Sequence, residues 1–209
     1  DELGRAYAKT NQLDKAITLY RKFLEKNPES ENASYNLANY LGRKGEHDEA
    51  IDIFGSLLER GIDRAEEVHL NLSNLYSEGP KLYSKSKNHL DQALLIDPHY
   101  QPAWFNLGNL NEQLGDLSEA KKCFEKVISL GDKGGCALAR LADLTRFDED
   151  DESALIEKME RNLHLKESPN PDLMFSLGRA YEQIGEYEKS FYMFESANSI
   201  DRHFLPDYL

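Results

Sequence analysis

The chain has 209 residues, 40% of them hydrophobic and 30% charged, so its composition is that of a globular protein and not of a disordered one. The 38 acidic and 25 basic residues give a formal net charge of -13. This charge opposes binding to nucleic acid or to anionic lipid, because both attract Lys and Arg. No apolar run approaches the roughly 20 residues of a membrane-spanning helix, so we expect neither a nucleic-acid nor a membrane partner.

The N-terminal residues resemble no targeting segment. They contain neither a basic stretch nor the apolar run of a signal peptide. The chain lacks an initiator Met and starts as if inside a helix, which indicates a trimmed piece of a longer protein. Its two cysteines, Cys123 and Cys136, have no metal-type spacing and do not indicate a disulfide framework. We therefore expect a reducing, cytoplasmic location.

Small residues recur along the chain in two columns with steps of 34 to 36 residues. The first column contains Gly4, Ala38, Ser73, Gly108, Ala142 and Gly178, and the second contains Ala16, Ala50, Ser86, Ala120, Ala154 and Ser190. A period of this length is typical of stacked structural repeats. We expect a single domain over residues 1–209, with repeats at about 1–30, 31–64, 65–99, 100–134, 135–170 and 171–204 and a tail at 205–209.

Each repeat has the pattern of two helices joined by a tight turn. Apolar residues recur at helical spacing on both sides of Gly115, a candidate left-handed helix stop, and Asp116 with Glu119 predicts an N-cap. Gly45 and Gly185 occupy the same joint, and the small columns allow two helices to cross closely. The helices are expected at roughly 1–11, 13–26, 31–43, 47–60, 65–77, 83–96, 101–114, 117–130, 135–146, 151–164, 171–184 and 187–201.

This pattern resembles the tetratricopeptide repeat (TPR) family. The resemblance rests on Leu3-Gly4-x-x-Tyr7, Trp104-x-x-Leu107-Gly108 and Leu177-Gly178-x-x-Tyr181 and covers nearly the whole chain. It implies an all-α fold, an α-α superhelix (TPR solenoid) of about six helix-turn-helix repeats. Two repeats depart from the pattern. The third has an enlarged turn at 78–82, and the fifth has the acidic run 148–152 and a second helix shifted in register.

Motifs of catalysis and metal binding are not found in the sequence. The six His are scattered, and the Gly-rich stretch 131–135 lacks the Gly-Lys-Ser/Thr ending of a phosphate loop and follows no predicted strand. The acidic run 148–152 lacks the Gly and the closing Glu of a calcium loop. We therefore expect no enzymatic activity, no metal and no cofactor.

An asparagine ladder is the most informative polar pattern. Its members are Asn36, Asn39, Asn71, Asn74, Asn106 and Asn109, which recur as i, i+3 pairs in steps of 35 residues. Each pair forms one helix stripe opposite the core face, and in the resembling family that face lines a concave groove. Because an amide both donates and accepts hydrogen bonds, the ladder predicts contact with the backbone of an extended peptide. The alternative is that these amides only bridge neighbouring helices or bind water.

Further residues on this face are candidates for binding. Tyr35 and Phe105 border the stripe, either as apolar anchors for a ligand or as packing against the neighbouring repeat. Arg140, Asp143 and Arg179 continue the face. The two arginines together could hold a carboxylate, or Arg140 and Asp143 could neutralise each other.

Three functions are compatible with these patterns. The first is a protein-protein interaction module that binds an extended peptide or partner segment in the concave groove. The second is a substrate-presenting arm of a sulfotransferase, because residues 145–202 resemble the repeat/catalytic-domain junction of bacterial TPR–sulfotransferase proteins. The third is a self-assembly scaffold, in which Phe204, Leu205, Tyr208 and Leu209 either cover the open end of the last repeat or dock on another copy to form a homo-oligomer through the C-terminal end. The clamp with which some TPR proteins hold the carboxylate of chaperones is not expected, since Asp1, Arg5, Glu67 and Asn71 occupy its places.

Overall fold

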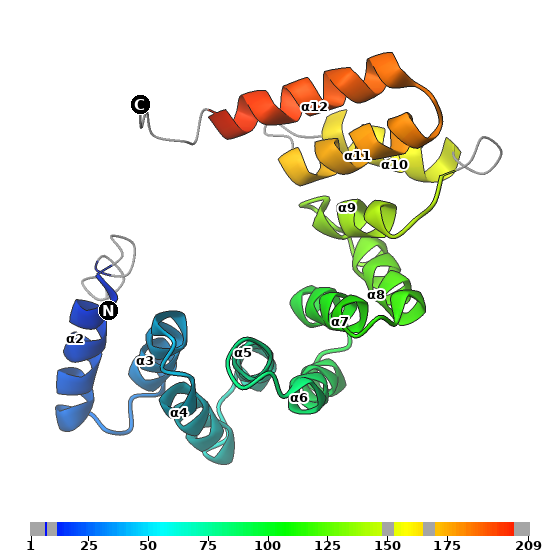
Figure 1. The fold of residues 1–209 in the computed structure, drawn as a ribbon. Helices are drawn as coiled ribbons and strands as arrows, with labels where there is room; N and C mark the ends of the chain where they lie inside the picture. Colours follow the sequence, from blue (N-terminus) through cyan, green and yellow to red (C-terminus); the bar gives the residue numbers. More distant parts are fainter. Residues whose placement is uncertain (1–6, 8–11, 148–152, 165–169, 203–209) are drawn as a thin grey trace. The chain divides into compact units, whose positions relative to one another are not determined.

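The computed structural model describes residues 7, 12–147, 153–164 and 170–202, which form helices and connecting turns without a strand (Figure 1). The helices are α2 (Leu13–Lys26), α3 (Glu31–Lys44), α4 (His47–Glu59), α5 (Ala65–Glu78), α6 (Tyr83–Ile96), α7 (Gln101–Gln113), α8 (Leu117–Ser129), α9 (Cys136–Asp143), α10 (Ser153–His164), α11 (Pro171–Gln183) and α12 (Tyr187–Arg202). The expected helix over 1–11 falls outside the described residues except for Tyr7, which is helical.

The chain forms two compact units, residues 1–103 and 104–209, and the boundary falls within α7. Unit 1 contains the hairpins α3–α4 and α5–α6 together with α2. Unit 2 contains α8 and most of α7, followed by the hairpins α9–α10 and α11–α12. The expectation of a single repeat domain over the whole chain stays a prediction.

The turns within the hairpins have the predicted chemistry. Gly45, Gly115 and Gly185 have φ angles of 90°, 85° and 80°, a left-handed conformation that Gly adopts without steric cost. After the second of these, Asp116 Oδ1 accepts a hydrogen bond of 3.1 Å from the backbone N–H of Glu119, which satisfies one of the free donors of α8. These contacts confirm the predicted hairpin joints.

The small-residue columns lie where the helices cross, and all but one of their described members are buried. Gly108 shows why bulk is excluded there, because a Cβ atom would lie 2.6 Å from the Phe124 ring. Ala154 is the exception and is exposed, because α10 turns Ile156 and Met159 inward instead. The expected register shift in the fifth repeat is therefore confirmed, while the assignment of Ala154 to the crossing column is wrong. Gly4 lies outside the described residues.

Three hairpins contain the same pair of aromatic rings, one ring from each helix. The ring centroids are 5.6 Å apart for Tyr35 and Phe54, 5.7 Å for Phe105 and Phe124, and 6.2 Å for Phe175 and Phe194. These six residues are called the hairpin aromatic pairs below. Each pair joins the two helices of its hairpin near the crossing point, so the hairpins share a common core geometry.

The end of α9 differs from the sequence-based expectation. The helix ends at Asp143 rather than near residue 146. Beyond it, Phe147 is only 6% exposed and joins the core of unit 2, and its backbone N–H donates a 3.0 Å hydrogen bond to Gln183 Oε1 on α11. Burying this ring requires the chain to leave the helical path early. The acidic run 148–152, expected as a solvated turn, lies outside the described residues.

Candidate functional site

Three members of the asparagine ladder line one pocket in unit 1. The pocket has a volume of about 190 Å³ and lies between α3 and α5. Its polar wall contains Asn39 from α3 and Asn71 and Asn74 from α5. The remaining lining residues are Ala38, Gly42, Arg43, Phe54, Leu75 and Glu78. The pocket therefore combines side-chain amides from two consecutive repeats with apolar and charged groups.

Apolar side chains form the floor of the pocket, and they belong to the core of the unit. Ala38 is 0% and Phe54 1% exposed, so the floor is held by hairpin packing. The helices approach closely here, because a Cβ atom at Gly42 would lie 2.7 Å from Leu75 Cδ2. A rigid apolar floor below polar walls is the usual construction of a ligand pocket.

Two charged residues at the pocket extend the asparagine stripes of the sequence. Arg43 follows Asn36 and Asn39 at i+7 on α3, and Glu78 follows Asn71 and Asn74 at i+7 on α5. Both side chains are exposed, and neither forms an ion pair with a described residue. Sequence reasoning missed both residues. The signal was present, since continuing each stripe by one more helical turn reaches them.

Asn71 also takes part in a contact between repeats. Its Nδ2 donates a 2.9 Å hydrogen bond to the Tyr35 hydroxyl, and that hydroxyl donates at 3.2 Å to Glu67 Oε2. The Arg64 guanidinium lies over the Tyr35 ring, 4.7 Å from its centroid, and 3.5 Å from the Glu67 carboxylate. Asn71 and Tyr35 therefore bridge α3 and α5, which agrees with the alternative interpretation that these residues join neighbouring repeats.

This bridge affects the acidity of two phenols in unit 1. Burial, together with the nearby Glu67 carboxylate, raises the pKa of Tyr35 above its ordinary value, and the hydrogen bonds from Asn71 and Asn39 only partly offset this rise. Burial and the same carboxylate raise the pKa of Tyr100 to about 12. Both hydroxyls thus keep their protons near neutral pH and act as hydrogen-bonding groups rather than as acids.

The remaining ladder members are half-buried but do not line the pocket. Asn36 lies on α3, and Asn106 and Asn109 lie on α7 in unit 2. Phe105 is half-buried beside them and packs against Phe124 of its own hairpin. The structure therefore brings together three of the six predicted amides, and the role of all six in binding stays a prediction.

In unit 2 the predicted charged residues bind one another or a neighbouring helix. Arg140 Nη2 lies 2.5 Å from Glu112 Oε2, and Arg179 Nη2 lies 2.5 Å from Asp143 Oδ1. The expected Arg140–Asp143 pair is replaced by these two pairs. Because each guanidinium already has a carboxylate partner, the two arginines do not form an open carboxylate site.

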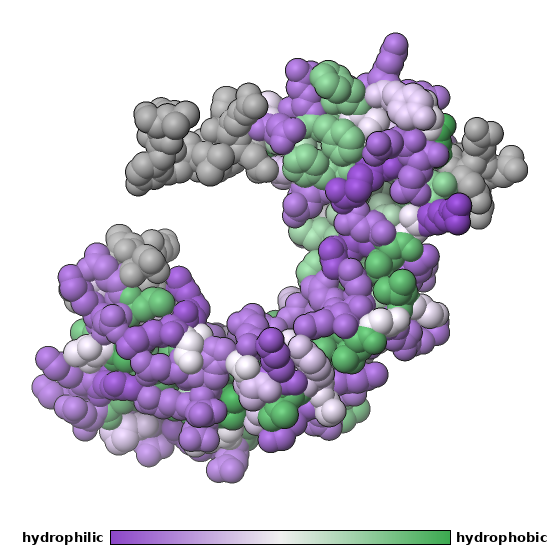
Figure 2. Space-filling view, viewed as in Figure 1, coloured by the Kyte–Doolittle hydropathy of each residue, from purple (hydrophilic) through white to green (hydrophobic). Residues whose placement is uncertain are grey.

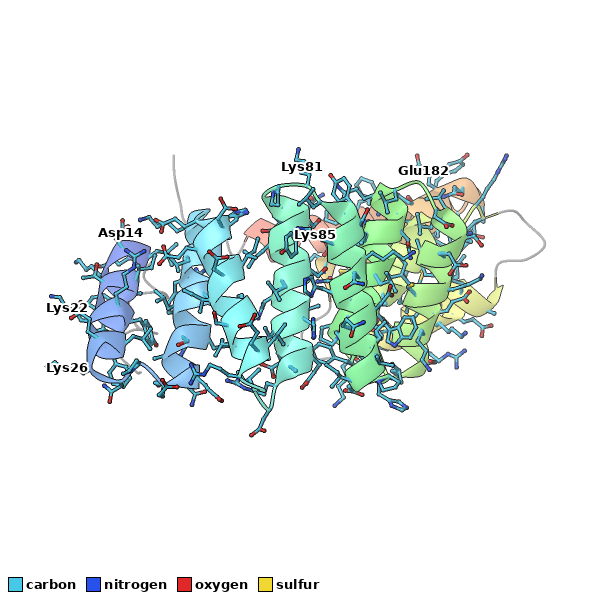
Figure 3. All side chains as sticks on the ribbon, turned by 90° about the horizontal axis from the view of Figure 1, so that it is seen from below. Asp14, Lys22, Lys26, Lys81, Lys85 and Glu182 are labelled. Atoms are coloured by element: carbon cyan, nitrogen blue, oxygen red, sulfur yellow. The ribbon has the colours of Figure 1, made fainter. Side chains whose placement is uncertain are left out.

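A pair of histidines joins the two helices of the α5–α6 hairpin, and sequence reasoning did not single it out. The Nδ1 atoms of His69 and His89 lie 2.9 Å apart, so one ring donates a hydrogen bond to the other. Tyr76 stacks on His89 with ring centroids 5.4 Å apart, and Lys85 extends over Tyr76 near the α5–α6 turn (Figure 3). Burial, then His69 and Lys85, lowers the pKa of His89 to about 4.

Two further findings concern the described residues only. Their His, Cys, Asp and Glu side chains form no group of three or more that could hold a metal ion. Among the helices of the described ranges, none is both long enough and apolar enough to cross a membrane.

Comparison with known families gives a match over more than half of the chain. One family model described as "Tetratricopeptide repeat" matches residues 2–65, and a second with the same description matches residues 101–130 and 171–204.

Curated relatives resemble this chain over part of their own length. The tetratricopeptide repeat-containing protein trd-1 of Caenorhabditis elegans is 28% identical over 124 residues, which are 59% of this chain and 15% of that protein. The heat-shock protein cognate co-chaperone sgt12 of Aspergillus fumigatus is 30% identical over 109 residues, which are 52% of this chain and 31% of that protein. The chain thus spans less than a third of the length of these two relatives.

Solved structures share the fold over almost the whole chain. PilF of Pseudomonas aeruginosa has a TM-score of 0.71 and 20% identity, covering 99% of this chain and 90% of its own. The protein TTC0263 of Thermus thermophilus has a TM-score of 0.60 and 20% identity, with coverage of 94% and 95%. MamA has a TM-score of 0.56 and 18% identity, with coverage of 96% and 95%. These likenesses confirm the expected fold class, an all-α array of helix-turn-helix repeats of the α-α superhelix class.

Proposed function

We propose that this chain, which belongs to the tetratricopeptide repeat family, is a protein-interaction module that holds an extended partner segment in the pocket between α3 and α5. The family match supports the general part of the proposal, since this fold serves protein recognition. The pocket supports the finer part, because it gathers Asn39, Asn71 and Asn74 above an apolar floor. This gathering of amides from consecutive repeats is the observation that carries the proposal.

Side-chain amides suit a ligand that is recognised through its backbone. An extended peptide presents N–H and C=O groups at regular intervals, and each Asn offers both a donor and an acceptor. Asn71 uses one N–H of its Nδ2 on Tyr35, which leaves the second N–H and the Oδ1 for a ligand. A peptide side chain would meet the apolar floor, which adds affinity without demanding a fixed sequence.

The two charged residues at the pocket favour one orientation of the bound segment. Arg43 belongs to α3 and Glu78 to α5, so the charges come from opposite walls. A segment with an acidic side chain near α3 and a basic one near α5 would form an ion pair with Arg43 and another with Glu78. Exposed pairs of this kind add about 0.2–1 kcal/mol each, so they tune orientation more than affinity.

The proposal is tested by selecting ligands and then removing amides. Twelve-residue random peptides displayed on phage are selected against the full chain, and the affinity of a selected peptide is measured by fluorescence polarisation. The double variant Asn39→Ala/Asn74→Ala is expected to weaken binding about 5- to 150-fold, since each of the two lost hydrogen bonds contributes about 0.5–1.5 kcal/mol. Circular dichroism checks that the variant stays folded.

The matched control is Asn88→Ala, which removes an exposed amide from α6 outside the pocket. Its affinity for the selected peptide should equal that of the unchanged chain. An unchanged affinity in the pocket variant, or an equal loss in the control, would contradict the assignment of binding to this pocket.

Two other functions, a sulfotransferase arm and a self-assembly scaffold, stay predictions. The prediction of a sulfotransferase arm rests on the sequence resemblance of residues 145–202 alone. It is tested by whether a strand and a phosphate loop follow residue 209 in the gene. Self-assembly is predicted from Phe204, Leu205, Tyr208 and Leu209, which lie outside the described residues, and light scattering against concentration tests it. The cytoplasmic location also stays a prediction, and it agrees with two free cysteines, Cys123 and Cys136.

A further inference from the structure

The α5–α6 hairpin differs from its neighbours where its two helices cross. The hairpin aromatic pairs belong to α3–α4, α7–α8 and α11–α12, and α5–α6 has leucines at the equivalent places. Its helices meet instead through two polar contacts. One joins His69 to His89, and the other joins the hydroxyls of Ser73 and Ser86 at 2.8 Å. This crossing is therefore polar where the others are largely apolar.

The packing of the repeat does not require imidazoles at these positions. The places of His69 and His89 are taken in the other three hairpins by Ser34 and Ile53, by Trp104 and Cys123, and by Met174 and Met193. Half-buried polar rings stabilise a core less than apolar side chains of similar size. A titratable pair that costs stability and has a shifted pKa is typical of a functional site.

The two imidazoles face each other with the geometry of a chelate. Their Nδ1 atoms lie 2.9 Å apart, and the rings are tilted by 37°. An imidazole nitrogen binds a divalent transition metal at about 2.0–2.1 Å, so this separation corresponds to an angle of about 90° at the metal. That angle suits the square-planar or tetragonal ions Cu²⁺ and Ni²⁺. The tetrahedral angle of Zn²⁺, about 109°, would need nitrogens about 3.3 Å apart.

Both rings are uncharged near neutral pH, as metal ligands must be. Burial lowers the pKa of His69, and burial with His69 and Lys85 lowers the pKa of His89 to about 4. In the hydrogen-bonded pair one Nδ1 holds a proton. When both Nδ1 atoms bind a metal, that proton moves to Nε2 of the same ring, so neither ring changes its charge.

The surroundings of the pair allow an ion to reach it. Both histidines are half-buried rather than buried, and hydrophilic side chains cover most of the surface of unit 1 that is in view in Figure 2. Tyr76 stacks on His89 with an angle of 8° between the rings, which fixes the orientation of that imidazole. The net charge of -13 attracts cations to the chain, whereas the nearby Lys85 opposes them locally.

We propose that His69 and His89 bind one divalent transition-metal ion, Cu²⁺ or Ni²⁺, through their Nδ1 atoms. Water fills the remaining coordination positions, because no third His, Cys, Asp or Glu of the described residues joins the pair. The ion connects α5 to α6 and is exchangeable, since two protein ligands hold it less tightly than the three or four of a structural site. This site is separate from the asparagine pocket, which lies between α3 and α5.

Titration of the full chain with NiCl₂ in a calorimeter tests the proposal. One tight site per chain is expected, and His69→Gln or His89→Gln should each weaken it at least about tenfold, because a direct ligand is lost. Glutamine can still hydrogen-bond to the remaining imidazole, and circular dichroism checks that the variants are folded. The matched control is His99→Gln, which changes an exposed histidine outside the hairpin and should leave the affinity unchanged.

Two further measurements report on the geometry of the site. Electron paramagnetic resonance with CuCl₂ should show coupling to two imidazole nitrogens, reduced to one in either glutamine variant. At low ionic strength Lys85→Gln should tighten Ni²⁺ binding about two- to fivefold, because it removes a positive charge near His89.

The results that would overturn the proposal are equally specific. Unchanged Ni²⁺ affinity in both glutamine variants, or an equal loss in His99→Gln, would assign binding to other groups. Tighter binding of Zn²⁺ than of Ni²⁺ would contradict the angle of about 90° at the metal. Binding that Lys85→Gln weakens would contradict the position of the ion beside His89.

Discussion

Equivalent positions of the repeat hold uncharged amides in unit 1 and an ion pair in unit 2. Asn39 and Asn74 in unit 1 occupy the same repeat positions as Asp143 and Arg179 in unit 2. The asparagines line a pocket of about 190 Å³, whereas the charged residues bind each other at 2.5 Å. The comparison teaches that this helix face is not a binding surface by position alone. In unit 1 its side chains line a pocket, and in unit 2 they pair with one another.

The hairpin interiors also differ between the units. His69 and His89 meet inside the α5–α6 hairpin of unit 1, and the equivalent residues of the α7–α8 hairpin in unit 2 are Trp104 and Cys123. The first pair is polar and titratable, whereas the second is bulky and largely apolar. Unit 1 is therefore expected to respond to acid at a place where unit 2 does not.

The largest expected effect concerns the crossing point of α7 and α8. Gly108→Val places a β-branched side chain where a Cβ atom already lies 2.6 Å from Phe124, while unit 1 has Ala38 and Ser73 at the same position. Overpacking should lower the free energy of unfolding by about 2–3 kcal/mol. Urea unfolding followed by circular dichroism measures the change.

Gly55→Val provides the matched control, because a Cβ atom at Gly55 on α4 meets nothing within 4 Å. It should change the free energy of unfolding by less than about 1 kcal/mol. Equal losses in the two variants would show that helix propensity, and not the close crossing, dominates at Gly108.

The next effect is a loss of stability in acid. The pKa of His89 is about 4 in the folded protein and 6.5 when unperturbed, and burial also lowers the pKa of His69. Between these pH values the unfolded chain binds more protons, so the stabilisation is complete above pH 6.5 and is lost as the pH falls toward 4. Because the rings are partly exposed, we expect a loss of about 1–2 kcal/mol.

Urea unfolding at several pH values measures this loss, and His89→Leu should reduce it. His99→Asn, which changes an exposed histidine, should leave the pH profile as it is. A profile that His89→Leu does not flatten would assign the acid sensitivity to the carboxylates instead.

The smallest effect on stability comes from transferring the charged pair of unit 2 into unit 1. Asn39→Asp/Asn74→Arg introduces the residues of Asp143 and Arg179 at the pocket. We expect the free energy of unfolding to change by less than about 1 kcal/mol, as for other exposed ion pairs. Binding of the selected peptide should fall about tenfold, because the new pair occupies the polar wall. Fluorescence polarisation and urea unfolding measure the two quantities.

The reverse exchange in unit 2, Asp143→Asn/Arg179→Asn, should leave peptide binding unchanged. A variant of unit 1 that keeps full affinity would mean that the amides of Asn39 and Asn74 do not contact the peptide. In that case the pocket would bind through its apolar floor alone.

Much of the fold could be predicted because it depends on local periodicity. The turn glycines, the N-cap at Asp116 and the inward turn of Met159 all follow from spacing within one repeat. The early end of α9 could not be predicted, because it depends on Phe147 reaching a core formed by residues distant in the sequence.

The candidate site was predictable only in part. The stripe of asparagines was visible in the sequence, but the bridge from Asn71 to Tyr35 joins residues 36 positions apart. The pairing of Arg140 with Glu112 likewise depends on how neighbouring repeats pack. Such contacts are set by the distance between helices, which spacing along one helix does not contain.

By itself, the sequence determined the helix-turn-helix repeat and the faces of its helices, because both follow from a period of about 3.6 residues within each helix. Only the tertiary structure decided which of the polar residues on those faces satisfy one another and which line a pocket. The reason is geometric. A hydrogen bond or an ion pair forms within about 4 Å, and that separation is fixed by packing between helices.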